Sequence, residues 1–170
     1  ATALLYLAFS WSQLSRAETI HEEIVATRGH EALRGQVKPS LGTNILFRAF
    51  YEHDGRYYAD AIRVPWVGSP RVYPGTSHPS LDLDDYARRE GLDSLARSDL
   101  QRFAFFSDGF VIEDPRLEGV LSDFRYAAIP NSVAPLWGVV VGGRTVGEHL
   151  KWVQNHDIPA SERARFFSML

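Results

Sequence analysis

An Asp-Gly bend between two β-prone runs constrains the fold of this chain more than any other feature. Residues 44–52 and 57–64 are rich in aromatic and aliphatic side chains, and Asp54 and Gly55 lie between them. A type I′ turn requires positive φ at both central residues, and glycine adopts that conformation without a Cβ penalty. The pattern therefore predicts an antiparallel hairpin.

The two faces of the predicted hairpin differ in composition. Pairing through the bend places three pairs of large side chains on one face: Tyr51 with Tyr58, Phe47 with Ile62, and Ile45 with Val64. We expect this face to contribute to the core. The other face carries longer polar side chains among alanines: Arg48, Glu52, Tyr57 and Arg63. This composition predicts a half-solvated sheet, or the floor of a shallow groove.

The N-terminal region predicts the longest helix. Residues 4–27 contain no helix breaker, and Gly29 supplies a stop. The opening stretch is nearly all apolar as far as Trp11, with Arg16 beyond it, but spanning a bilayer takes about 20 apolar residues. The composition is that of the end of such a span, or of an amphipathic helix that docks on the core. We expect residues 1–28 to form this helix, with or without a preceding transmembrane part, and 29–170 to form a single α+β soluble domain.

The remaining segments predict an irregular loop, short helices and further strands. Four prolines and two glycines make residues 65–79 a loop, and Ser80 and Ser98 are expected to open two helices. Residues 110–113, 120–129 and 136–141 are strand candidates, and helices are expected at 148–155 and from Pro159 onward. The predicted fold is α+β, with an antiparallel sheet of about five strands packed against the long N-terminal helix. Further helices lie between the strands and at the C-terminus.

Composition and motifs exclude several functions. The net charge of −3 gives no large positive field, so no nucleic-acid partner is expected. The chain has no cysteine, which excludes disulfides, thiolate catalysis and cysteine-based zinc sites. His21 begins a motif like that of zinc proteases, but the second histidine position is occupied by Val25, and His30 would lie on the opposite side of a helix. No metal ligand is therefore predicted.

A cluster of polar residues is the best candidate for chemistry. Asp123 and Arg125 project to the same side if residues 120–129 form a strand, because the side-chain period of a strand is two. With Asp108 nearby, these side chains would bind a polar ligand. The alternative is that Asp123 and Arg125 satisfy one another at a packed edge.

These segments also carry a resemblance to a known family. Residues 123–131, 135–138 and 106–110, together with the hairpin, resemble the C-terminal soluble region of the YdjM-like inner-membrane proteins, a family of membrane-bound metal-dependent hydrolases. The resemblance covers residues 4–152. It implies a bacterial inner membrane, with the domain on an undetermined face, and a divalent metal in a full-length parent but no cofactor in this fragment. The membrane, or the transmembrane part of its own chain, would be its first partner.

No catalytic residue is assigned, and three hypotheses remain open. The first is an extramembrane domain that faces substrate or binds a protein partner or a small ligand. The second is a cystatin-like module that binds a small molecule or lipid in a pocket lined by Trp66, Phe105 and Trp137. The third is a free-standing hydrolase that uses Asp108, Asp123 and Arg125 for acid/base chemistry and anion binding. The candidate ligand-binding residues are Asp108, Asp123, Arg125, Tyr126, Asn131 and Trp137.

Overall fold

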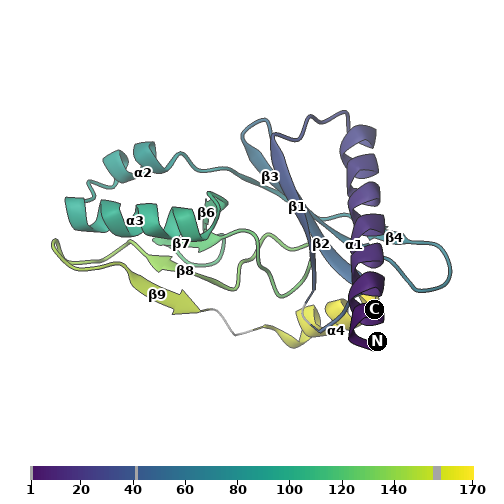
Figure 1. The fold of residues 1–170 in the computed structure, drawn as a ribbon. Coiled ribbons are helices and arrows are strands. Elements are labelled where there is room, and N and C mark those ends of the chain that lie inside the picture. The colour runs from purple at the N-terminus through teal and green to yellow at the C-terminus, as the bar shows by residue number, and fades with distance from the viewer. Residues whose placement is uncertain (1, 41, 155–157) are drawn as a thin grey trace.

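Two antiparallel sheets and four helices make up the α+β fold in the computed structural model, which describes residues 2–40, 42–154 and 158–170 (Figure 1). The first sheet contains β1 (Arg34–Pro39), β2 (Leu46–His53), β3 (Arg56–Arg63) and β4 (Arg71–Tyr73) in that order, and β5 (Ser77–Pro79) also pairs with β3. The second sheet has the order β6 (Val111–Glu113), β7 (Val120–Asp123), β8 (Trp137–Val140) and β9 (Lys151–Gln154). The helices are α1 (Thr2–Thr27), α2 (Leu83–Arg89), α3 (Ser94–Phe106) and α4 (Ala160–Met169).

The hairpin forms as predicted, with the predicted register. Asp54 and Gly55 have φ values of 47° and 66°, as a type I′ turn requires. Tyr51 lies opposite Tyr58, and Phe47 lies opposite Ile62. The local bend therefore determines how β2 and β3 pair.

One face of the hairpin packs against α1, as expected. Phe47, Ile62 and Val64 form a buried cluster with Ala17 of the helix. Ala17 is fully buried, and its small side chain allows the helix to approach the sheet closely. The buried side chain of Gln13 also donates a hydrogen bond of 2.8 Å from Nε2 to the carbonyl of Val64. The predicted five-stranded sheet against a long N-terminal helix is thus present.

The other face of the hairpin is buried, so the prediction of a half-solvated sheet or groove floor is wrong. Phe50 and Tyr57 pack against Phe110 and Phe124, which belong to the part of the chain that carries the second sheet. Arg48 is 4% exposed, and its guanidinium donates to the carbonyls of Phe124, Pro130 and Ser132 at 2.6–2.7 Å. The segment that covers this face follows 50 residues or more later in the sequence, beyond the reach of local patterns.

The second sheet packs against α2 and α3 (Figure 1). Leu100 and Phe103 of α3 are buried against Leu121 and Val139 of β7 and β8. Three strands of this sheet, β6, β7 and β8, lie at predicted strand positions, but they pair with β9 in a separate sheet and do not join the hairpin in a single sheet of about five strands. Among the described residues, none of the helices has both the length and the apolar character that crossing a membrane requires.

Several predicted element boundaries need correction. Residues 65–79 contain the short strands β4 and β5, because β3 offers them a pairing edge. The expected helix at 148–155 is the strand β9 over Lys151–Gln154, paired with β8, and residue 155 lies outside the described residues. The predicted strand at 120–129 ends at Asp123, whereas α4 begins directly after Pro159 as expected.

The helix caps lie elsewhere than predicted. The Oδ1 atom of Asp82 accepts a hydrogen bond from the backbone N–H of Asp85, so Asp82 rather than Ser80 caps α2. Asp93 caps α3 in the same way, and that helix begins four residues before Ser98. A carboxylate satisfies a free N–H and also favours the positive end of the helix dipole.

Candidate functional site

Asp123 and Arg125 form a bidentate ion pair at the end of β7. Arg125 Nε donates to Asp123 Oδ1 at 3.0 Å, and Nη2 donates to Oδ2 at 2.8 Å. Asp123 is fully buried, and the Arg125 side chain is 11% exposed. The two residues do not share one strand as expected. They meet because the chain turns after Asp123, whose Oδ1 also accepts the backbone N–H of Arg125 at 3.0 Å.

A row of five aromatic rings runs past this ion pair: Phe103, Phe106, Trp152, Trp137 and Tyr126, here called the aromatic row. The ring centroids of neighbours lie 4.7–6.5 Å apart, within the range of favourable aromatic contacts. Trp152 and Phe106 are about half exposed, at 49% and 52%. The row therefore presents ring surface to solvent.

The guanidinium of Arg125 lies among the rings of the aromatic row. Its central carbon is 5.4 Å from the Tyr126 ring centroid and 5.8 Å from that of Phe106. The hydrogen bonds to Asp123 raise the pKa of Arg125 above its ordinary value, so the cation is held firmly. Trp137 Nε1 donates to Asp123 Oδ2 at 3.4 Å, which fixes one ring of the row to the same carboxylate.

Polar side chains of β1 border the aromatic row. Lys38 Nζ lies 4.4 Å from the Tyr126 ring centroid and donates to its hydroxyl at 3.1 Å. Asp108 Oδ2 accepts a hydrogen bond of 3.1 Å from Gln36 Nε2. The carboxylate of Asp108 also contributes to the raised pKa of Arg125, after the hydrogen bonds to Asp123 and against the effect of burial. Asp108 thus belongs to the same surface as the ion pair.

Asn131 lies apart from the other candidate residues. It is 3% exposed, and its Nδ2 donates to the backbone carbonyls of Tyr73 and Pro74 at 3.4 and 3.0 Å. These contacts tie the segment after β7 to the loop after β4. The sequence motif placed Asn131 next to the ion pair, but the structure brings together Asp108, Asp123, Arg125, Tyr126 and Trp137 without it.

The three rings expected to line an apolar pocket lie in different places. Trp66 contacts Phe9 of α1, with ring centroids 5.4 Å apart, whereas Trp137 belongs to the aromatic row. Phe105 is 91% exposed. In the part of the chain that the structure describes, these three rings do not enclose a common cavity.

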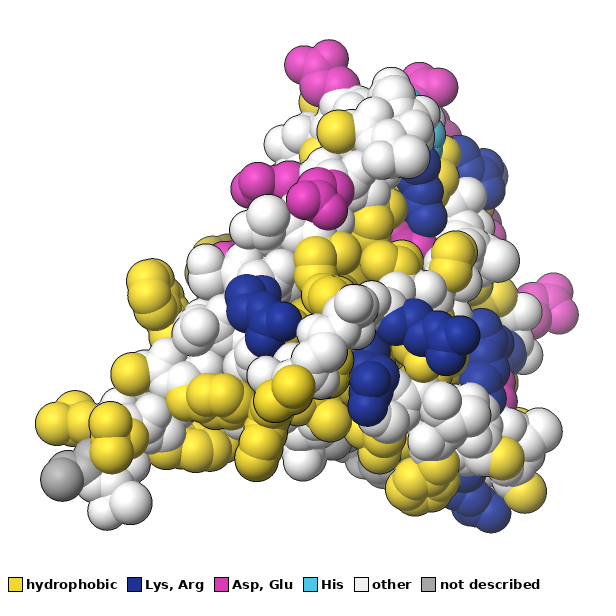
Figure 2. All heavy atoms as spheres, turned by 90° about the vertical axis from the view of Figure 1, so that its right-hand side faces the viewer, with side chains coloured by type: hydrophobic (Ala, Val, Ile, Leu, Met, Phe, Trp, Pro, Cys, Tyr) yellow, Lys and Arg dark blue, Asp and Glu magenta, His cyan; other side chains and the backbone are white. Residues whose placement is uncertain are grey.

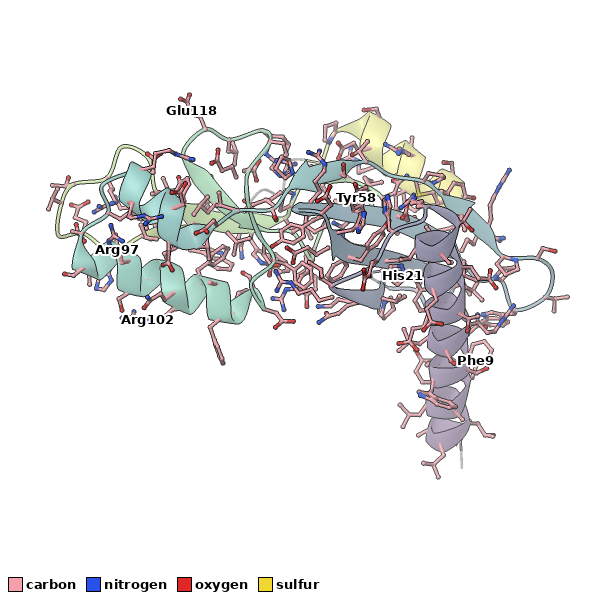
Figure 3. The ribbon with its side chains drawn as sticks, turned by 90° about the horizontal axis from the view of Figure 1, so that it is seen from above. Phe9, His21, Tyr58, Arg97, Arg102 and Glu118 are labelled. Atoms are coloured by element: carbon pink, nitrogen blue, oxygen red, sulfur yellow. The ribbon has the colours of Figure 1, made fainter. Side chains whose placement is uncertain are left out.

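A second polar cluster, which the sequence did not predict, fastens the end of α1 to the hairpin. Asp60 is fully buried and accepts two hydrogen bonds from Arg28, at 2.7 and 2.8 Å. Arg28 also donates to the Tyr51 hydroxyl at 3.0 Å, and His30 Nδ1 lies 2.8 Å from that hydroxyl. His21 of α1 and Tyr58 of β3 lie close to this cluster, near the C-terminal end of α1 (Figure 3), and both contact the ring of Tyr51.

The histidines of this second cluster do not fit a metal centre. His30 stacks on His53 with ring centroids 4.1 Å apart, and the Nδ1 atom of each ring already has a hydrogen-bond partner. Within residues 2–40, 42–154 and 158–170, no group of three or more metal-ligating side chains is arranged to hold an ion. The cluster therefore fits a structural role.

The N-terminal part of α1 projects beyond the sheets and exposes apolar side chains (Figure 3). We call the following residues the apolar tip: Leu4, Leu5, Tyr6, Leu7, Trp11, Trp66 and Val67. Each of them is at least 62% exposed. On the adjoining face, basic side chains gather around the middle and acidic ones toward the far end (Figure 2). The molecule is thus apolar at one end of this face and acidic at the other.

Comparison of this chain with protein-family models, curated proteins and solved structures finds no match.

Proposed function

We propose that this chain is a membrane-apposed binding domain, held at a bilayer surface by the N-terminal part of α1. The exposure of the apolar tip is the observation that carries this proposal. Burying apolar side chains such as leucine from water stabilises by roughly 1.5–3 kcal/mol each. Contiguous exposed apolar surface of this kind marks a contact with a membrane or another molecule.

The charges next to the apolar tip favour a bilayer as its partner. Arg16 Nη1 donates to the Pro65 carbonyl, directly before Trp66. Arg63 of β3 lies opposite Arg71 of β4 in the strand register. Among the residues that the structure describes, these three arginines have no Asp or Glu side chain in ion-pair contact, and Arg63 Nε donates to the Leu170 oxygen. Basic residues near anionic lipids contribute about 1 kcal/mol each. Apolar residues and tryptophan followed by arginines without an acidic partner are the composition of a membrane interface.

The ion pair supports binding rather than acid/base chemistry by this domain. Both oxygens of Asp123 are engaged, by Arg125 and Trp137, and the carboxylate is fully buried. A general base needs an oxygen within reach of a substrate proton. In this proposal, hydrolysis and its divalent metal belong to a longer, membrane-bound parent, as the family resemblance implies, and this domain faces substrate or a partner.

Binding to vesicles tests the proposal. The full chain is floated with vesicles of anionic and of zwitterionic lipid, together with Leu7→Glu and the matched control Leu33→Glu. Leu7 and Leu33 are 62% and 71% exposed, but Leu7 lies near the start of α1, whereas Leu33 lies after the helix has ended, directly before β1. We expect stronger binding to anionic vesicles, a loss of at least tenfold for Leu7→Glu, and wild-type binding for Leu33→Glu. Absence of vesicle binding, or an equal loss in both variants, would refute the proposal.

A second candidate function, capture of a protein partner, is favoured by the aromatic row. Tryptophan, tyrosine and arginine dominate the energetic centres of protein interfaces, and Trp152, Tyr126 and Arg125 lie together here. The Asp123 carboxylate holds Arg125 in place before a partner arrives, which lowers the ordering cost of association. Cross-linking from position 152 in the full-length parent tests this function, with position 146 as the control, since Val146 is exposed but outside the row.

A further inference from the structure

A cavity of about 250 Å³ lies between α4 and the segment that follows β7. Its walls are mainly apolar: residues 127–129, Leu136, Phe166 and Phe167. Small-molecule sites typically enclose 300–1,000 Å³, with apolar walls and a few polar groups. The cavity therefore fits a ligand with one slender apolar chain and is too small for the two chains of a phospholipid.

The core beneath α4 keeps this cavity in place. Met169 of α4 is 3% exposed and is buried with Leu46, Ala61 and Ile129. Phe166, one turn earlier, packs partly against the same cluster and also lines the cavity. The wall that α4 provides thus rests on the first sheet.

Two polar groups that line the cavity have no hydrogen-bond partner among the described residues. The Oγ atom of Ser40 is buried and makes no hydrogen bond to the described residues. The backbone N–H of Ser40 donates a hydrogen bond of 2.8 Å to the Leu46 carbonyl, which fixes the backbone there. Arg163 also lines the cavity, and its guanidinium has no hydrogen bond or ion pair with any residue in 2–40, 42–154 or 158–170. A buried polar atom without a partner is uncommon and costs free energy. A ligand that bonds to Ser40 would recover that cost.

We propose that this cavity binds a single-chain anionic amphiphile of the fatty-acid class. The carboxylate pairs with the Arg163 guanidinium and bonds to the Ser40 hydroxyl, and the chain lies against Leu136 and Phe166. Charge-assisted hydrogen bonds to a guanidinium are among the strong ones in proteins. This inference goes beyond the membrane-apposed role, because it requires no bilayer.

Titration of the full chain with decanoate, without vesicles, tests this site by calorimetry and by amide NMR shifts. We expect saturable one-to-one binding that Arg163→Gln weakens about tenfold. The matched control Arg165→Gln, on the same helix but outside the cavity wall, should change the affinity less than twofold. Decanol, which has no charge, should bind wild type and Arg163→Gln equally.

Ser40→Ala separates a ligand contact from a structural role. It removes an unpaired buried hydroxyl, so the unfolding midpoint should stay the same or rise while decanoate affinity falls several-fold. Ala128→Phe fills the cavity and should abolish binding. If that variant does not fold, the Arg163→Gln and Ser40→Ala results decide.

Three results would overturn the site: no saturable binding by folded wild type, equal losses in Arg163→Gln and Arg165→Gln, or unchanged binding in a folded Ala128→Phe. Leu7→Glu should bind decanoate like wild type, so failure at the bilayer and failure in the cavity remain distinguishable.

Discussion

The ring of Phe9 meets the ring of Trp66 edge to face, with centroids 5.4 Å apart. Phe9 belongs to α1, and Trp66 belongs to the loop between β3 and β4. Such a contact contributes about 0.5–1.5 kcal/mol beyond area burial. It joins two distant segments into one exposed surface, so the apolar tip is part of the folded domain and is more than a frayed helix end.

Trp66→Ala should therefore weaken vesicle binding more than it weakens the fold. Trp66 is 68% exposed, so we expect a loss of about 1 kcal/mol in the free energy of unfolding. Loss of its ring from a bilayer interface should lower anionic-vesicle affinity about tenfold. Co-sedimentation checks this, with Trp152→Ala as the control. An equal loss of vesicle affinity in Trp66→Ala and Trp152→Ala would mean that the apolar tip is not the surface that contacts the bilayer.

Arg48→Met should destabilise the fold by about 3 kcal/mol or more. The substitution leaves the carbonyls of Phe124, Pro130 and Ser132 without their donor, and an unsatisfied buried group costs about 1–3 kcal/mol. Burial lowers the pKa of Arg48 to about 9, against the opposing effects of Asp123 and Asp60. The charged guanidinium is therefore costly to bury and depends on the three carbonyls that accept its hydrogen bonds. Urea denaturation measures the loss. The exposed Arg102→Met is the control, and a loss no larger than the control's would contradict the role assigned to Arg48.

Asp60→Asn should cost about 3–5 kcal/mol, because it leaves Arg28 without its charged partner next to the buried site. The matched control is Asp85→Asn, which removes an exposed ion pair with Arg88 and should cost about 0–1 kcal/mol. The difference in unfolding free energy between the two variants is the informative quantity. Similar small losses would show that the buried cluster does not fasten α1 to the hairpin.

Stability should fall as the pH drops below about 6.5, in part because of His21. Burial lowers the pKa of His21, and Arg28 acts in the same direction, whereas Asp60 and Glu22 oppose it. The unfolded chain therefore binds more protons than the folded one just below the ordinary histidine pKa, so unfolding becomes easier as the pH falls through that window. His21→Gln should flatten this pH dependence of the urea midpoint. An unchanged slope would mean that His21 does not titrate differently on folding.

Local rules explain the parts of the fold that the sequence predicts. The Asp54 and Gly55 bend specifies its own turn type, and the register of β2 and β3 follows from it. By contrast, β1 contains Gly35 and Pro39, both poor strand formers, and exists because β2 offers it a pairing edge. A Cβ at Gly35 would lie 2.8 Å from the Phe50 carbonyl, so the close approach of the two strands requires glycine there.

The candidate site divides in the same way. Four of its residues lie within one short stretch of sequence, and the motif there predicts them: Asp123, Arg125, Tyr126 and Trp137. Their neighbours Trp152 and Lys38 come from β9 and β1, whose places depend on tertiary pairing.

The N-terminal helix, the Asp54 and Gly55 bend and the motif around Asp123 can thus be predicted from short sequence segments. Three other features depend on packing between segments that are distant in the sequence. They are the burial of Arg48, the second sheet and the cavity beside α4. Arg48 is the clearest case: an arginine among alanines indicates a solvated face unless a later segment supplies carbonyls to cover it.

Insertion of the apolar tip can be measured directly, because the chain has no cysteine and a single introduced one can carry an environment-sensitive fluorophore. Leu7→Cys and Leu33→Cys, each labelled with the same dye, are titrated with anionic vesicles. We predict a blue-shifted, brighter emission at position 7 and no change at position 33. An unchanged emission at position 7, or equal changes at both positions, would contradict a membrane-apposed domain.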